Sequence, residues 1–137
     1  MLKKTTLFIL LLNTFLSLNA IELNWINDYE KALLVAKKEH KDVYVFVGAD
    51  ECRFCDRFKK TTLQDKQLIK DLKKDYVPVY LSRDRHKIPA KFKTRGVPRH
   101  YFVTSDDKVF YDTWGSREVD GFYSVLDDAE LSKSDAK

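Results

Sequence analysis

Residues 43–55 read Val-Tyr-Val-Phe-Val-Gly-Ala-Asp-Glu-Cys-Arg-Phe-Cys. The first five form an unbroken run of β-branched and aromatic residues, which is typical of a strand buried on both faces in a central parallel sheet. Gly48 to Glu51 end that strand, and a charged helical stretch follows from Cys52 to Lys60. The sequence therefore places a Cys-x-x-Cys pair where a buried strand turns into a helix.

Elements of alternating type flank this turn. Apolar residues at helical spacing, and β-branched or aromatic runs, predict helices over about 27–40, 52–60, 65–72, 89–93 and 122–129 and strands over 43–47, 76–81, 100–104 and 109–113. Asp65 is the expected cap of the third helical segment, and Pro78 is expected at the start or edge of its strand. Ser105–Lys108 predicts an antiparallel hairpin between the last two strands.

The order of these elements predicts the fold class. A βαβ half gives parallel strands, and a hairpin followed by a helix completes the sheet. We therefore expect an α/β fold, a three-layer sandwich in which a central mixed sheet of about four strands carries helices on both faces.

The composition fits one globular domain. The 137 residues are 44% hydrophobic and 34% charged, with four Gly and three Pro, which excludes disordered, collagen-like and low-complexity chains. The formal net charge is only +4, whereas nucleic-acid-binding proteins carry a strongly basic face, so no nucleic-acid partner is expected. Two cysteines are too few for a disulfide-rich scaffold or a four-thiolate zinc site.

The first twenty residues have the pattern of a secretory signal peptide. A basic Met-Leu-Lys-Lys start precedes an apolar run from Leu7 to Leu18, and Ala20 ends the segment. The run is short for a membrane span of about 20 apolar residues. We expect cleavage after Ala20, no stable membrane anchor afterwards, and an exported domain over residues 21–137 with a frayed polar tail from about residue 132. The alternative is an uncleaved N-terminal anchor.

The position of Cys52 predicts an activated thiol. Unsatisfied backbone N–H groups and the helix dipole favour an anion at a helix N-terminus, and the thiolate is the nucleophile of disulfide exchange. Cys55 lies one helical turn later and is expected to be more covered. Arg53 adds positive charge near the thiolate and Glu51 opposes it, so both are candidates for tuning its pKa.

Two structural interpretations compete with redox chemistry for this pair. A bridge that closes so small a loop gives less entropic stabilisation than a long-range one. A zinc site needs two further ligands, and His40, His86 and His100 show no His-x₃₋₅-His spacing. The sequence favours redox chemistry, with no metal ligands and no cofactor.

These residues together resemble the thioredoxin-like superfamily, over most of residues 22–130. The resemblance rests on Val43–Val47, on Cys52-Arg53-Phe54-Cys55, and on Gly96-Val97-Pro98 before the third strand. It implies a cis Val97–Pro98 bond, a Pro98 that lies against the dithiol, and a Val97 backbone that pairs with the substrate chain. The stretch from Trp25 through Tyr29-Glu30-Lys31-Ala32-Leu33, followed by Gly48-Ala49-Asp50, is similar to small exported bacterial members in particular, which implies a periplasmic location.

Three positions depart from the family pattern. Glu51 stands where a Trp is usual, Arg53-Phe54 where a general thioredoxin has Gly-Pro, and Phe46 where thioredoxins carry a buried Asp that helps to deprotonate the second cysteine. These departures argue against a general thioredoxin. They favour a dedicated exported oxidoreductase whose proton acceptor is Glu51, Asp50 or water.

The resemblance implies a thiol–disulfide oxidoreductase acting on protein or small-molecule disulfides. Cys52 attacks the substrate disulfide and Cys55 resolves the mixed disulfide. Val97 before the proline resembles reducing members, which favours a reductase that a membrane electron donor re-reduces. The protein is expected to be a monomer. The alternatives are a disulfide-forming oxidase and a redox-inactive or metal-binding thioredoxin-like module.

Several residues near the predicted substrate loop have open roles. His100, two residues after Pro98, either approaches the dithiol or, as favoured here, is a strand histidine that faces solvent or a helix. The basic segment 83–99 is either a solvated face or helps to choose acidic partners. Trp114 is interpreted as a packing residue.

Overall fold

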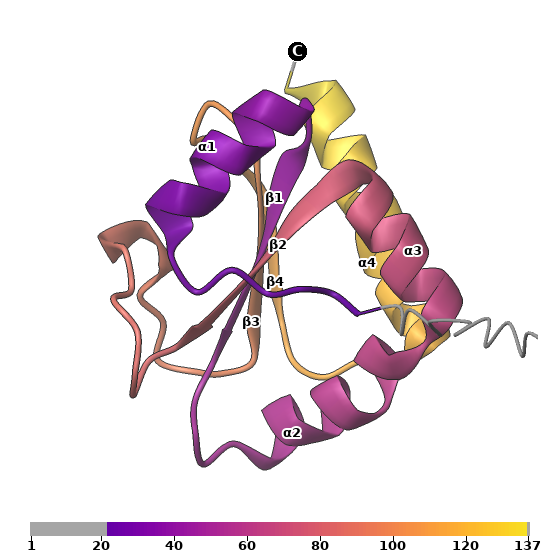
Figure 1. Ribbon diagram of the computed structural model, residues 1–137. Coiled ribbons are helices and arrows are strands. Elements are labelled where there is room, and N and C mark those ends of the chain that lie inside the picture. The colour runs from indigo at the N-terminus through magenta and orange to yellow at the C-terminus, as the bar shows by residue number, and fades with distance from the viewer. Residues whose placement is uncertain (1–21, 137) are drawn as a thin grey trace, which may run out of the picture.

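A four-stranded mixed sheet forms the middle layer of the computed structural model, which describes residues 22–136 (Figure 1). The strands are β1 (Asp42–Gly48), β2 (Tyr76–Ser82), β3 (Arg99–Val103) and β4 (Val109–Trp114). Their spatial order across the sheet is β2-β1-β3-β4. β1 pairs with β2 in parallel and with β3 in antiparallel orientation, and β3 pairs antiparallel with β4. The predicted mixed sheet is confirmed, and the predicted signal peptide at residues 1–20 lies outside the described residues.

Helices cover both faces of this sheet, as the sequence predicts. They are α1 (Tyr29–Glu39), α2 (Arg53–Lys60), α3 (Lys66–Asp75) and α4 (Val119–Asp135), with short 3₁₀ turns η1 (Thr62–Gln64) and η2 (Ala90–Phe92). Figure 1 shows α1 on one side of the sheet and α3 and α4 on the other, with α2 at one end of the strands. The result is the expected three-layer sandwich.

The two faces of β1 belong to two separate apolar clusters because successive side chains of a strand point to opposite faces. Val43, Val45 and Val47 pack in the cluster that includes α1. Tyr44 and Phe46 pack in the cluster that includes the cysteine pair and residues of α2, α3 and α4. Burial on both faces explains why this strand has no polar alternation.

Local hydrogen bonds set where the helices begin. The Asp28 carboxylate accepts the Lys31 backbone N–H at 3.1 Å, and the Asp65 carboxylate accepts the Leu68 N–H at 2.8 Å, so the expected cap at Asp65 is confirmed. Between α2 and α3, Thr61 and Thr62 interrupt the helix, and η1 takes its place.

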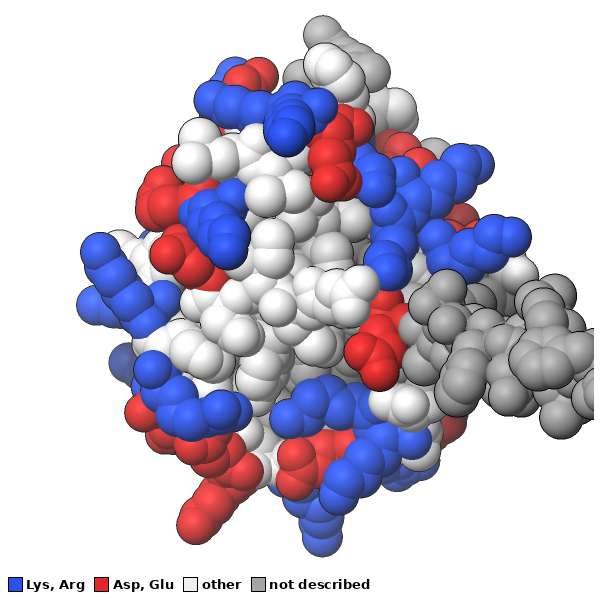
Figure 2. Space-filling view, viewed as in Figure 1, with Lys and Arg blue, Asp and Glu red and all other residues white. Residues whose placement is uncertain are grey.

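The outer edge of β2 is covered by the segment before α1. The Ile26 N–H donates to the Pro78 carbonyl, and the Tyr80 N–H donates to the Ile26 carbonyl, each at 3.0 Å. Figure 2 views this side of the molecule and shows charged side chains of both signs interspersed around an uncharged centre. Within residues 22–136, none of the helices combines the length and the apolar character needed to span a membrane.

The C-terminal end differs from the sequence prediction. α4 continues to Asp135, so residues 132–135, which were predicted to fray, are helical. The reason is a long-range contact of Lys133, whose ammonium donates to the Asp42 carboxylate at the start of β1 and lies 5.7 Å from the centre of the Phe110 ring. These contacts hold the last turn of the helix against the sheet.

Candidate active site

Cys52 is the residue that caps the N-terminus of α2. Its backbone is extended, with φ −138° and ψ 98°, and its Sγ accepts a hydrogen bond from the Cys55 backbone N–H at 3.1 Å. A sulfur in this position experiences both that N–H and the positive end of the helix dipole. The same contacts would stabilise a thiolate once the Cys52–Cys55 disulfide of this structure is reduced.

The two cysteines differ in access. Cys52 keeps 8% of its surface exposed, whereas Cys55 is completely buried, in the same cluster as Phe46 and Phe58. The expectation that Cys55 is the more covered of the pair is confirmed. A large substrate can therefore approach only the Cys52 sulfur directly.

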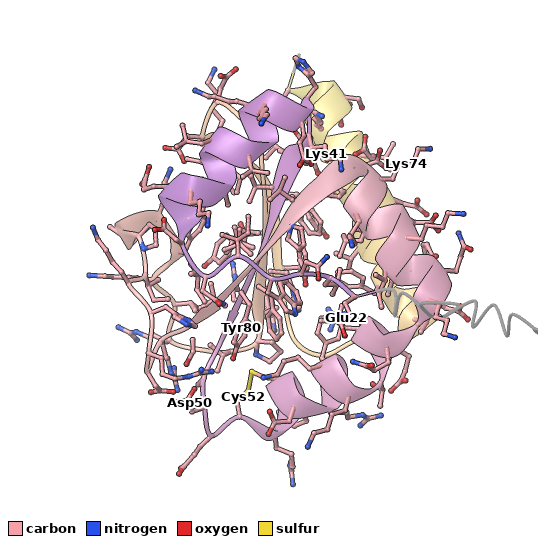
Figure 3. All side chains as sticks on the ribbon, viewed as in Figure 1. Glu22, Lys41, Asp50, Cys52, Lys74 and Tyr80 are labelled. Atoms are coloured by element: carbon pink, nitrogen blue, oxygen red, sulfur yellow. A yellow bond between two sulfur atoms is a disulfide. The ribbon has the colours of Figure 1, made fainter. Side chains whose placement is uncertain are left out.

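Asp50 lies next to the dithiol but is engaged elsewhere. Figure 3 shows Asp50 and Cys52 near each other where β1 leads into α2. The Asp50 carboxylate accepts hydrogen bonds from the Arg85 guanidinium at 2.7 Å and from the Ser82 hydroxyl at 2.8 Å. These bonds, led by the one from Arg85, lower the pKa of Asp50. A carboxylate with a lowered pKa is a weaker base, and both of these hydrogen bonds occupy the carboxylate, so Asp50 is poorly suited as the proton acceptor.

The two candidate tuning residues lie on the surface on either side of Cys52. Glu51 and Arg53 are both exposed, and the Arg53 guanidinium carbon lies 5.2 Å from the centre of the neighbouring Phe54 ring. Exposed charges act on a thiol through solvent, which weakens their effect. Within the described part of the chain, no three His, Cys, Asp or Glu side chains are grouped to hold a metal ion.

Pro98 lies in a groove beside the cysteine motif. The Val97–Pro98 peptide bond is cis, Pro98 is buried, and its carbonyl accepts the Gly115 N–H at 2.9 Å. Val97 and Pro98 line a groove of about 580 Å³ together with Phe54, which lies between the two cysteines in sequence. We call this cavity the Pro98 groove; its other lining residues are Arg57, Thr94, Gly96, Arg99, Trp114, Gly115, Ser116, Arg117 and Glu118.

The Pro98 groove also contains residues that sequence reasoning missed. Residues 114–118, from the end of β4 to the residue before α4, form one of its walls. Trp114 is 67% exposed, so its interpretation as a packing residue is wrong. The basic segment 83–99 contributes Arg99 to the groove lining, whereas Arg85 pairs with Asp50. A Trp-Gly turn directly after a strand was the sequence feature that could have drawn attention to this wall.

His100 is buried behind the groove and does not face solvent. It packs against helices, with its ring centre 5.0 Å from that of Phe58 in α2 and 5.7 Å from that of Phe122 in α4. The expectation of a helix-facing histidine is confirmed, and the solvent-facing version is wrong. Because the Gly115 carbonyl can only accept, Nε2–H of His100 donates to it at 3.0 Å. Nδ1 then accepts the Tyr44 hydroxyl at 2.8 Å.

This arrangement keeps the His100 imidazole neutral. Burial lowers the pKa of His100 to about 4, despite its hydrogen bond to the Gly115 carbonyl. The chain of contacts runs from Tyr44 through His100 and Gly115 to the Pro98 carbonyl. His100 therefore holds the backbone that forms the groove, and it has no free ring nitrogen for chemistry at the dithiol.

Comparison with known proteins places the site in a wider group. Residues 24–105 match a protein family described as thioredoxin-like, a span that includes the cysteine pair and Pro98. The chain is 30% identical over 63 residues to an uncharacterized protein of Archaeoglobus fulgidus, covering 46% of this chain and 50% of that protein. It is 23% identical over 94 residues to anterior gradient protein 3 of Mus musculus, covering 69% and 57%. The chain thus spans about half the length of the curated relatives it matches.

Solved structures share the fold. A thioredoxin from Thermus thermophilus superposes with a TM-score of 0.63 at 22% identity, covering 74% of this chain and 83% of the other. A structure titled DsbH oxidoreductase gives a TM-score of 0.58 at 21% identity, covering 79% and 84%. These likenesses confirm that the predicted three-layer sandwich is of the thioredoxin-like type.

Proposed function

This chain belongs to the thioredoxin-like family, and on that premise we propose that it is an exported thiol–disulfide oxidoreductase that reduces its substrates through Cys52 and Cys55. The observation that carries the proposal is the position of Cys52. Its sulfur caps a helix and accepts a backbone N–H, and Phe54, two residues later in the motif, lines the Pro98 groove.

The reduced protein transfers two electrons to a substrate disulfide. The Cys52 thiolate attacks one substrate sulfur, the substrate S–S bond breaks, and the other substrate sulfur leaves and takes up a proton. Cys55 then loses its proton to Glu51 or water and attacks the Cys52 sulfur. The Cys52–Cys55 disulfide forms, and the second substrate thiol is released.

The groove supplies the binding edge for this exchange. The family resemblance assigns substrate pairing to the backbone of Val97 and implies that Pro98 lies against the dithiol. What supports this assignment is that both residues line the cavity that Phe54 borders. Glu51 and Arg53 adjust the charge around Cys52 from the surface.

Two sequence features support the direction of electron flow and the location of the protein in the cell. Val97 before the proline supports the reducing direction, and the pattern of residues 1–20 supports export to the periplasm. A reductase in an oxidising compartment needs its electrons from elsewhere. We therefore propose a membrane electron donor, protein or small-molecule disulfides as substrates, and a monomeric protein.

Substitution of single cysteines tests the proposal. Cys55→Ser should trap substrates as mixed disulfides on Cys52, because attack occurs and resolution cannot, whereas Cys52→Ser should neither react nor trap. Trapping by Cys52→Ser instead of Cys55→Ser would contradict the assignment of roles. The reduction potential decides the direction: a value near that of thioredoxin, about −270 mV, supports a reductase, and one near about −120 mV indicates a disulfide-forming oxidase.

A further inference from the structure

Two exposed aromatic side chains border the Pro98 groove. Phe54 of α2 is 52% exposed and Trp114 at the end of β4 is 67% exposed. Both line this one cavity, although apolar side chains are stabilised by burial. Its volume of about 580 Å³ lies within the range of about 300–1,000 Å³ that is usual for ligand pockets. Exposed apolar surface in a groove of this size marks a place where another molecule docks.

Three arginines line the same groove, and they differ in how their charges are compensated. Arg57 forms an ion pair with Glu118 at 2.6 Å, and Arg99 forms one with Asp112. The Arg117 side chain donates only to the neighbouring Ser116 carbonyl, at 3.3 Å, and has no ion pair among the described residues. Arg117 therefore presents a charge that a carboxylate from outside the protein would complement.

The wall that carries Arg117 is fixed in place by long-range hydrogen bonds. The buried Thr62 hydroxyl donates to the Arg117 carbonyl, and the Gly115 N–H donates to the Pro98 carbonyl. Gly115 has a φ of +94°, and a Cβ added there would lie 2.9 Å from Arg117 Nη1. The Arg117 guanidinium thus lies over Gly115, the residue whose N–H donates to the Pro98 carbonyl. A binding wall whose backbone is fixed before the ligand arrives loses little entropy on binding.

We propose that Arg117 and Trp114 make this oxidoreductase selective for protein substrates that carry a carboxylate and an apolar side chain near the reacting cysteine. The proposal rests on the proposed function and adds its substrate class. The occupant is an extended polypeptide segment, because an apolar side chain would cover Phe54 and Trp114 while the carboxylate pairs with Arg117. A small anionic disulfide would leave the aromatic walls uncovered.

The test uses matched peptides and the reduced protein. Each peptide carries one cysteine as a mixed disulfide with pyridine-2-thiol and one leucine nearby, and the peptides differ only in a Glu, Gln or Lys two residues from the cysteine. Release of the thiol reports the rate constant of attack in a stopped-flow instrument. Neutral 2,2′-dithiodipyridine measures the intrinsic reactivity of the dithiol, and glutathione disulfide represents small anionic substrates.

The wild-type protein should react about fivefold faster with the Glu peptide than with the Gln peptide, the scale of one exposed ion pair. Arg117→Gln should remove this preference, and Arg117→Glu should reverse it toward the Lys peptide, when each peptide rate is divided by the rate of the same variant with 2,2′-dithiodipyridine. Lys108→Gln is the matched control, because it removes the same charge at the exposed turn before β4, the strand end opposite Trp114. Trp114→Ala should slow all three peptides more than it slows 2,2′-dithiodipyridine.

Three results would overturn the proposal: equal rates of the Glu and Gln peptides in the wild type, a preference that survives in Arg117→Gln, or the same loss in Lys108→Gln. A dependence on Arg117 that glutathione disulfide shares, with no effect of Trp114→Ala on the peptides, would assign the groove to small anionic disulfides instead. Failure of the proposed function is distinguishable, because a dithiol without exchange activity would also be inert toward 2,2′-dithiodipyridine.

Discussion

Acid should destabilise this protein through His100, and substitution to Phe should remove that part of the effect. In the folded state the His100 imidazole stays neutral, because burial lowers its pKa from the ordinary value of 6.5 to about 4. The unfolded chain binds a proton at pH values where the folded chain does not. The contribution of neutral His100 to the free energy of unfolding is therefore fully present above about pH 6.5, and it is lost as the pH falls toward 4.

The magnitude follows from the difference between the two pKa values. Each unit corresponds to about 1.4 kcal/mol, so the full contribution of His100 is about 3 kcal/mol, and about 2 kcal/mol of it is lost between pH 7.5 and pH 5.0. At pH 7.5 the His100→Phe variant should be less stable than the wild type by about 1–3 kcal/mol for each group that loses its partner, the buried Tyr44 hydroxyl and the part-buried Gly115 carbonyl. That gap should narrow by about 2 kcal/mol at pH 5.0.

Urea unfolding at both pH values measures the free energies of unfolding. If His100→Phe alone is too unstable to fold, the double variant Tyr44→Phe/His100→Phe removes the unpaired hydroxyl and gives the same comparison. His40→Asn is the control, because His40 is exposed and its φ of 55° is one that Asn tolerates; it should keep the wild-type dependence. A gap between wild type and His100→Phe that stays constant from pH 7.5 to pH 5.0 would refute this reasoning.

Two further predictions concern the dithiol and the groove. In the reduced protein, ultraviolet absorbance of the thiolate should give Cys52 a pKa below the free-thiol value of about 8.5, because its sulfur caps α2; a midpoint at or above that value would contradict an activated thiol. Thr62→Val should lower the free energy of unfolding by about 1–3 kcal/mol by leaving the part-buried Arg117 carbonyl unpaired. It should also slow exchange with peptide substrates more than with 2,2′-dithiodipyridine, and equal slowing would argue against a role of Thr62 in shaping the groove.

Much of the fold could be predicted because its determinants are local. The run Val43–Val47 specifies a doubly buried strand by composition alone, and Asp65 caps α3 through a bond to a residue three positions later. The position of Cys52 at a strand-to-helix turn follows from the same local pattern. For these features the physical cause lies within a few residues of the effect.

The features that were missed depend on partners far away in the sequence. His100 is buried because Tyr44, 56 residues earlier, gives it a hydrogen-bond partner inside the core. The last turn of α4 is ordered because Lys133 reaches Asp42, 91 residues away. Likewise, the Thr62 bond to the Arg117 carbonyl spans 55 residues. No local pattern indicates such pairs. The sequence alone therefore predicts a frayed polar tail and a strand histidine that faces either solvent or a helix.

The strand-like contact of Ile26 has a consequence for association between molecules. An unpaired sheet edge is a template on which another chain can add a strand, and that addition starts domain swapping and aggregation. The two hydrogen bonds between Ile26 and β2 occupy the middle of that edge, and Pro78 offers no N–H there. Colloidal stability of this small domain thus depends on a short stretch of chain that contributes nothing to the chemistry of the dithiol.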